Sequence, residues 1–109
     1  MSRFGMVIDL DVCAGCQCCT AACRMENNIP FAGPEEGAQG RSISWMQVLP
    51  IVEGEYPRPR TRFLPIPCMH CENPPCVKVC PVGATYKSED GITAQVYARC
   101  IGCRYCTTA

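Results

Sequence analysis

The sequence lacks the features that mark membrane-spanning, secreted and nucleic-acid-binding chains. No apolar run approaches the roughly 20 residues that a transmembrane helix needs. The N-terminal segment has neither the long apolar stretch nor the small-residue cleavage site of a secretory signal. Ten Lys and Arg residues balance ten Asp and Glu residues, so we expect no global attraction to nucleic acid or anionic lipid.

Catalytic signatures are missing as well. The chain has one histidine, His70, whereas a Rieske centre requires two histidines on one iron. We therefore expect His70 either to contact a metal-binding residue without binding the metal itself, or to pack at the surface. No nucleophile–base pair and no glycine-rich phosphate loop is present. We expect no enzymatic site in this chain itself.

Cysteine, in contrast, is abundant, with twelve in 109 residues. Disulfides, zinc and iron–sulfur clusters are the three chemistries that use so many thiols in a short chain. Disulfides are disfavoured because the cysteines crowd into three short runs, within residues 13–23, 68–80 and 100–106. Each run gathers several thiols around one point, as metal coordination requires.

The spacing of these runs is that of bacterial ferredoxins. Run one is C-x2-C-x2-C-x3-C, run two is C-x2-C-x4-C-x3-C followed by Pro81, and run three repeats the first three positions of run one. In such runs three cysteines bind one [4Fe–4S] cluster and the fourth binds its neighbour. A zinc site, built from two CxxC pairs, is the alternative. The predicted ligands are Cys13, Cys16, Cys19, Cys23, Cys68, Cys71, Cys76, Cys80, Cys100, Cys103 and Cys106.

Cys18 is the one cysteine left outside this ligand set. It lies beside Cys19, but only Cys19 gives the spacing found in run three. We expect Cys18 to be a small buried apolar filler.

Runs one and three form an internal repeat. Residues 13–16, CAGC, align with residues 100–103, CIGC, and Cys19 then aligns with Cys106. The counterpart of Cys23 falls just beyond Ala109. The chain is therefore expected to be a truncated fragment, with Cys as the next residue of the parent sequence.

Pairing of the runs follows from the same ligand rule. If runs two and three are partners, one cluster is complete within the chain. Its ligands are Cys80, Cys100, Cys103 and Cys106. The first three cysteines of run two then lack a fourth ligand, and run one requires a further run that the sequence does not contain.

Alternating apolar residues predict several strands. Residues 4–10 are expected to form a short strand that leads into run one, and residues 91–98 another that leads into run three. Residues 42–52 and 61–67 are expected to pair as a hairpin, with their prolines at edge positions.

Composition predicts the remaining segments and the organisation of an α+β, ferredoxin-like iron–sulfur domain. Residues 20–27 favour a short helix, and the Gly- and Glu-rich residues 32–41 favour a loop. The expected domain organisation is a first half-module over 1–31, a β-rich insertion over 32–67, and a ferredoxin-like module over 68–109.

The three runs resemble a known family in their order and spacing. CAGCQCCTAAC, CMHCENPPCVKVCP and CIGCRYCTTA, joined by residues 24–67, are similar to the four-cluster ferredoxin-type iron–sulfur subunit of the molybdopterin oxidoreductases, such as the DMSO, polysulfide and formate-linked enzymes. The related subunit of alternative complex III looks similar too. The resemblance covers essentially the whole chain, and PCMHCENPPCVKVCPVGAT is its most specific part.

This resemblance implies up to four [4Fe–4S] clusters in the full-length subunit. Cys13, Cys16 and Cys19 would bind one cluster and Cys23 another, each completed by an absent fourth run. The first three cysteines of run two would bind a third cluster, and the fourth cluster would be the complete one described above. Some relatives hold a [3Fe–4S] centre where a cysteine of run three is replaced. Because Cys103 is present, a four-iron cluster is expected there.

The resemblance also implies a function and partners. In that family the subunit relays electrons between a molybdopterin-type catalytic subunit and a polytopic membrane subunit that reacts with quinone. The implied location is peripheral and membrane-associated, on either face of the membrane. A soluble ferredoxin that diffuses between partners is the alternative, and a zinc-stabilised binding module is a further one. Residues 24–67 exceed what a bare carrier needs, which disfavours the soluble ferredoxin.

Overall fold

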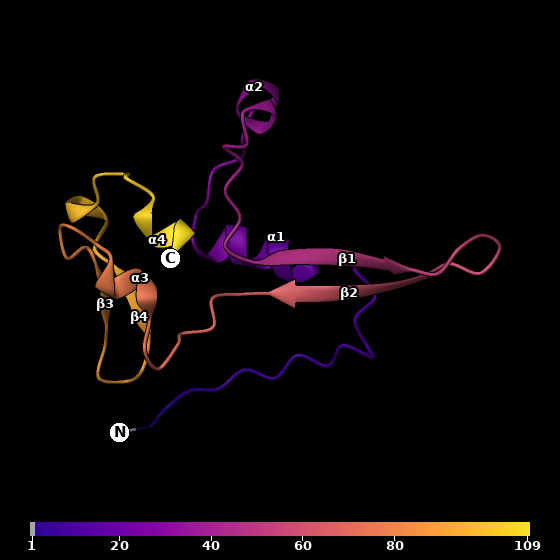
Figure 1. The fold of residues 1–109 in the computed structure, drawn as a ribbon, viewed down its shortest axis with the longest axis horizontal. Helices are drawn as coiled ribbons and strands as arrows, with labels where there is room; N and C mark the ends of the chain where they lie inside the picture. The colour runs from indigo at the N-terminus through magenta and orange to yellow at the C-terminus, as the bar shows by residue number, and fades with distance from the viewer. Residues whose placement is uncertain (1) are drawn as a thin grey trace. The chain divides into compact units, whose positions relative to one another are not determined.

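The structure is a computed structural model that describes residues 2–109. It divides the chain into two compact units (Figure 1). Val7–Cys68 form the hairpin unit, and residues 2–6 together with Met69–Ala109 form the C-terminal unit. Both contain short helices and a two-stranded antiparallel sheet, so the expected α+β class is confirmed.

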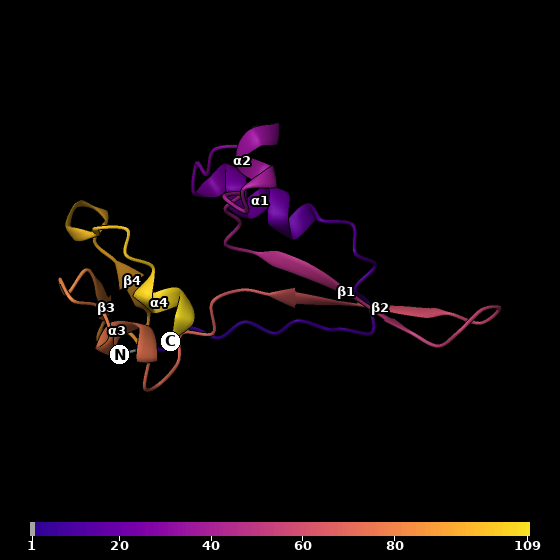
Figure 2. The ribbon, with the colours of Figure 1, turned by 45° about the horizontal axis from the view of Figure 1, so that its top comes forward.

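A long β-hairpin dominates the hairpin unit. β1 (Gln47–Glu53) pairs antiparallel with β2 (Arg60–Ile66), and Leu49 lies opposite Leu64. The connecting loop projects away from the helices of this unit in both views (Figure 2). The hairpin predicted from the sequence is confirmed, although β1 is shorter than expected.

Two helices precede this hairpin. α1 (Cys18–Glu26) contains most of the predicted helix and begins two residues earlier. α2 (Pro34–Ala38) lies where a loop was expected, so that prediction is wrong. Proline at the first position and the Glu36 carboxylate, which accepts the Gly33 N–H at 3.1 Å, start this short helix despite its glycines.

The strand predicted over residues 4–10 is also wrong. Residues 2–9 have no regular structure, and a turn begins at Leu10. Alternation shows which side chains would share a face, but a strand forms only where a neighbouring strand supplies hydrogen-bond partners. Within the described residues, this segment has no such ladder.

The C-terminal unit is built from very short elements. In chain order they are α3 (Pro75–Lys78), β3 (Thr85–Lys87), β4 (Thr93–Gln95), the 3₁₀ helix η1 (Tyr97–Arg99) and α4 (Tyr105–Thr108). β3 and β4 pair antiparallel, and Lys87 lies opposite Thr93. The strand predicted over 91–98 is confirmed only in its centre, because η1 replaces its end.

Little apolar surface is buried in either unit. Among the described residues, the buried apolar side chains are Ile29, Met46, Val48 and Pro65 in the hairpin unit and Pro74 and Ala84 in the C-terminal unit. Tyr56 remains 95% exposed. A core this small gives weak stabilisation, so cross-links from bound metal have an obvious structural use here.

The described part of the chain contains no helix that is both long and apolar enough to span a bilayer.

Candidate iron–sulfur cluster site

Four predicted ligands come together in the C-terminal unit. They line one cavity, and they are the four that the pairing rule assigns to one cluster: Cys80, Cys100, Cys103 and Cys106. The volume of this cavity is about 20 Å³, roughly room for one water molecule. All twelve cysteines are free thiols in the structure. The lining residues therefore supply four cysteine thiols, which is the type of donor set that a [4Fe–4S] cluster takes.

Left-handed residues curl run three around this cavity. Gly102 has φ 71° and Arg104 has φ 59°, and α4 begins directly after Arg104. Run one repeats this turn, with Gly15 at φ 70° and Gln17 at φ 64°, and α1 begins directly after Gln17. The internal repeat found in the sequence is thus also a repeat of backbone conformation.

Run two shares only the first of these two left-handed positions, and it does so without glycine. His70 occupies the position of Gly15 and Gly102, directly before the second cysteine, and has φ 44°. Few residues with a Cβ adopt this conformation, although histidine is among those that tolerate it. The His70 Nδ1 accepts a hydrogen bond from the Thr93 N–H at 2.9 Å, which ties the exposed imidazole to β4.

These turns have a chemical use. Left-handed residues next to right-handed ones direct successive backbone N–H groups into a concave nest that accepts negative charge, as at many iron–sulfur sites. The full turn recurs in runs one and three, so the backbone of these two runs is shaped to stabilise negative charge on bound ligands.

Cys80 shows this stabilisation directly. Its Sγ accepts the Ala84 N–H at 3.2 Å. Hydrogen bonds from the Thr85 N–H, then the Val82 N–H, with smaller ones from Ala84 and the Thr85 hydroxyl, outweigh burial and lower the pKa of the Cys80 thiol to about 7. Because the thiolate is the form that binds metal, this environment prepares Cys80 as a ligand.

The ligands of run one lie in the hairpin unit. Cys13 and Cys23 are half-buried, whereas Cys16 and Cys19 are exposed. The Cys23 Sγ is 3.6 Å from the Asn27 amide nitrogen, which donates to it from the end of α1.

The expectation for Cys18 is wrong, because its side chain is exposed rather than buried. Cys18 is the first residue of α1, and its N–H points back toward the Cys16 thiol. This N–H, with the Cys18 thiol, lowers the pKa of Cys16, while the same contact raises the pKa of Cys18. Cys18 thus stabilises the thiolate of Cys16, a predicted ligand, instead of filling an apolar core.

Run two is divided between the units. Cys68 is the last residue of the hairpin unit, and Cys71 and Cys76 belong to the C-terminal unit. Cys76 is half-buried in α3, and Cys71 is exposed. Within residues 2–109, no three Cys, His, Asp or Glu side chains converge closely enough to hold a single metal ion.

Sequence reasoning missed several supporting groups. The backbone N–H groups that point at Cys80 leave no trace in residue identity, and Lys87, 16 residues after Cys71, holds the loop of Cys71. The signal for His70 was present: the alignment of CMHC with CAGC and CIGC places histidine where the other runs have glycine.

Comparison with protein families agrees with this geometry. Residues 59–109, which contain runs two and three, match the model of the 4Fe-4S dicluster domain. All the residues that line the cysteine-rich cavity lie within this matched segment.

Curated relatives extend the match to nearly the whole chain. A selenate reductase subunit from Mesobacillus selenatarsenatis is 51% identical over 104 residues, which cover 95% of this chain and 32% of the relative. The iron-sulfur cluster-binding subunit of menaquinone reductase from Nitratidesulfovibrio vulgaris is 50% identical over 106 residues, covering 95% of this chain and 41% of the relative. A tetrathionate reductase subunit from Salmonella typhimurium is 45% identical over 108 residues, covering 98% of this chain and 40% of the relative.

These matches confirm the resemblance to the iron–sulfur subunits of oxidoreductase complexes. The dicluster domain accounts for the C-terminal part of the match, and run one lies outside it. The chain spans about a third to two fifths of the length of the relatives described above.

Proposed function

We propose that this chain is part of an electron-transfer subunit of a respiratory oxidoreductase. It relays electrons through [4Fe–4S] clusters between a molybdopterin-type catalytic subunit and a polytopic membrane subunit that reacts with quinone. The observation that carries this proposal is the set of four free thiols around one cavity inside a 4Fe-4S dicluster domain. The relatives support a role in such a relay, since their names include selenate, tetrathionate and menaquinone reductases.

Ligand assignment follows the pairing rule. One cluster is bound by the four cysteines of the cavity, and the first three cysteines of run two bind the other cluster of the dicluster domain. In run one, Cys13, Cys16 and Cys19 bind a further cluster and Cys23 another. The ligands still needed are proposed to come from a fourth run outside this sequence. Residues 32–67, which include β1 and β2, are proposed to be an insertion between the two halves.

A bound [4Fe–4S] cluster supplies one-electron oxidation and reduction. The chain itself fixes the thiolates, directs backbone N–H groups at their sulfurs, and leaves no protein side chain that acts on a substrate. The N–H groups around Cys80 favour added negative charge, and therefore favour the reduced state of the group that Cys80 holds. The chain therefore transfers electrons, and the reaction with substrate takes place in another subunit.

The location follows from the partners. We propose a peripheral position in a membrane-associated complex, on one face of the membrane. A freely diffusing ferredoxin is less well supported, because the similar relatives are named as subunits of reductases. A zinc module is less well supported than clusters, because the matching domain is a 4Fe-4S domain.

A matched pair of cysteine substitutions tests this proposal. In the full-length subunit, isolated anaerobically with its complex, Cys103→Ser should remove or convert one cluster, seen as the change of one EPR signal and a loss of iron. Cys18→Ser removes an exposed thiol outside the proposed ligand set but keeps the N–H that contacts Cys16, so it should keep every cluster. A wild-type subunit without iron and acid-labile sulfide would refute the function. Loss of a cluster in Cys18→Ser would refute the ligand assignment.

A further inference from the structure

The loop of Cys71 is held by both strands of the small sheet. The Lys87 Nζ, at the end of β3, donates to the carbonyl oxygens of Cys71 at 2.8 Å and Glu72 at 2.9 Å. Its third contact is with the Glu72 carboxylate at 3.3 Å. An ammonium group has three N–H donors, so the cation is fully used in holding this loop.

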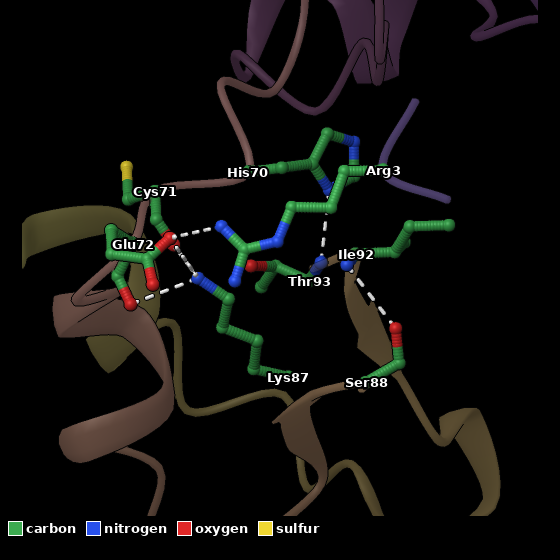
Figure 3. Close-up of polar contacts among 8 residues, drawn as sticks. All are labelled: Arg3, His70, Cys71, Glu72, Lys87, Ser88, Ile92 and Thr93. Atoms are coloured by element: carbon green, nitrogen blue, oxygen red, sulfur yellow. Dashed lines mark hydrogen bonds and ion pairs between the residues drawn. The ribbon is translucent and has the colours of Figure 1, made fainter. Parts of the chain in front are cut away.

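The second attachment comes from the partner strand. Thr93 lies opposite Lys87 in the β3–β4 ladder, and its N–H donates to His70 Nδ1 at 2.9 Å. One pair of opposite residues in the sheet therefore holds the chain on both sides of the Cys71 Cα. Thr93 binds His70 before it, and Lys87 binds the carbonyl oxygens of Cys71 and Glu72 after it. Figure 3 shows the Lys87 amine directed at Cys71 and Glu72 and the imidazole above Thr93.

We call the contacts from Lys87 and Thr93 to residues 70–72 the clamp. The positive charge of the Lys87 ammonium group in this clamp is largely shielded from solvent. The Lys87 side chain is 21% exposed, whereas the Glu72 side chain is 74% exposed. Arg3 also approaches the Glu72 carboxylate, at 3.4 Å, but its side chain is 69% exposed (Figure 3). Solvent screens the outer pair more strongly than the inner cation. A positive charge thus stays beside the backbone of a proposed ligand.

We infer that Lys87 is a positioning residue that fixes Cys71 and raises the reduction potential of the cluster that Cys71 binds. This inference rests on the proposed function. Reduction adds an electron to a centre held by anionic ligands, so a sheltered cation next to a ligand residue stabilises the reduced state. Glu72 opposes this effect, and its exposure weakens that opposition.

The test uses the full-length subunit in its complex, prepared anaerobically, with redox titrations followed by EPR. The signal that Cys71→Ser abolishes identifies the cluster. Lys87→Met should lower the midpoint potential of that cluster alone by about 59 mV, which is a tenfold change in the ratio of oxidised to reduced cluster. Lys87→Arg, which keeps the charge, should restore most of the wild-type potential.

The matched control is Ser88→Ala. Ser88 Oγ accepts the Ile92 N–H at 3.2 Å within the same hairpin, away from the bonds that hold Cys71 (Figure 3). This variant should leave the potential unchanged, since it perturbs the hairpin without touching the clamp. Lys87→Gln also removes the charge but keeps a polar group, and it should lower the potential of the same cluster, which keeps the test open if Lys87→Met fails to assemble.

The outcomes separate the two claims. A wild-type protein that lacks iron and labile sulfide overturns the proposed function. Clusters present with an unshifted potential in Lys87→Met, or in Lys87→Gln where Lys87→Met is lost, overturn only the role of Lys87. An equal shift in Ser88→Ala also overturns it, because any damage to the hairpin would then have the same effect.

Discussion

The turn before the second cysteine is built in two ways in this chain. Runs one and three use glycine, at Gly15 and Gly102, and no side chain has to be accommodated at φ near 70°. Run two uses His70 and depends on a hairpin whose contacts lie 16 and 23 residues further along the chain. With glycine, the turn needs no contact from elsewhere in the chain. With histidine, the strained turn is stabilised by a hydrogen bond from a strand that follows later in the sequence.

The two glycines also differ from each other. A Cβ at Gly15 would lie 2.6 Å from the Phe63 ring of β2, whereas a Cβ at Gly102 would meet nothing within 4 Å. Gly15 is therefore required twice, for its backbone conformation and for close packing of run one on the hairpin. Gly102 is required for conformation alone.

Substitution of these glycines should give the largest effect. Gly15→Ala should lower the free energy of unfolding by about 2–4 kcal/mol, because left-handed strain adds to overpacking against Phe63. Gly102→Ala should cost about 1–2 kcal/mol from strain alone. Thermal unfolding of the assembled protein, with iron retention as a second measurement, should rank them in that order.

Phe63→Leu provides the control for the packing part. In the Gly15→Ala background it should recover part of the loss, whereas in the Gly102→Ala background it should only add its own effect. Equal destabilisation in the two alanine variants would contradict the distinction between them.

The sequence predicted the type of cofactor, but not the hydrogen-bonding groups that hold the cysteines in place. Spacing predicts that Cys80 joins run three, because short intervals between thiols follow ligand geometry, and this assignment stays a prediction. The proposed set lines one cavity around Cys80 and Cys106. The N–H groups near Cys80 and the amine of Lys87 were not predictable, because backbone donors have no residue signature and tertiary contacts skip along the chain.

The fold was predictable where the pattern had a local cause. α1 followed from composition and its end at Asn27, and the β1–β2 hairpin from two apolar segments around a turn. The strand over residues 4–10 failed because alternation cannot supply a partner strand. α2 was missed because proline and a capping glutamate outweighed its glycines. Whether a strand or helix formed at these two places thus depended on pairing partners or capping residues, which composition alone does not reveal.

His70 offers an intermediate effect that tests its dependence on the sheet. His70→Ala keeps the left-handed strain and loses the bond to Thr93, so it should cost about 1 kcal/mol. His70→Gly also loses the bond but relieves the strain, so its net effect should be close to zero. Chemical denaturation of the assembled protein would measure both. If His70→Gly proves the more damaging, residue 70 does not keep the left-handed conformation in solution, because both variants lose the imidazole and differ only in the Cβ.

Gln17 should give the smallest effect, with the opposite sign to that usual for glycine. It precedes α1 at φ 64°, so Gln17→Ala keeps the Cβ strain whereas Gln17→Gly removes it. The relief, about 1 kcal/mol, is largely offset by the greater freedom of glycine in the unfolded chain, which leaves a net gain of about 0.5 kcal/mol. Ala22→Gly, within α1, is the control and should cost about 1 kcal/mol. Melting temperatures should therefore rise for glycine at position 17 and fall for glycine at position 22; a fall at both would mean that the left-handed turn of run one is not maintained in solution.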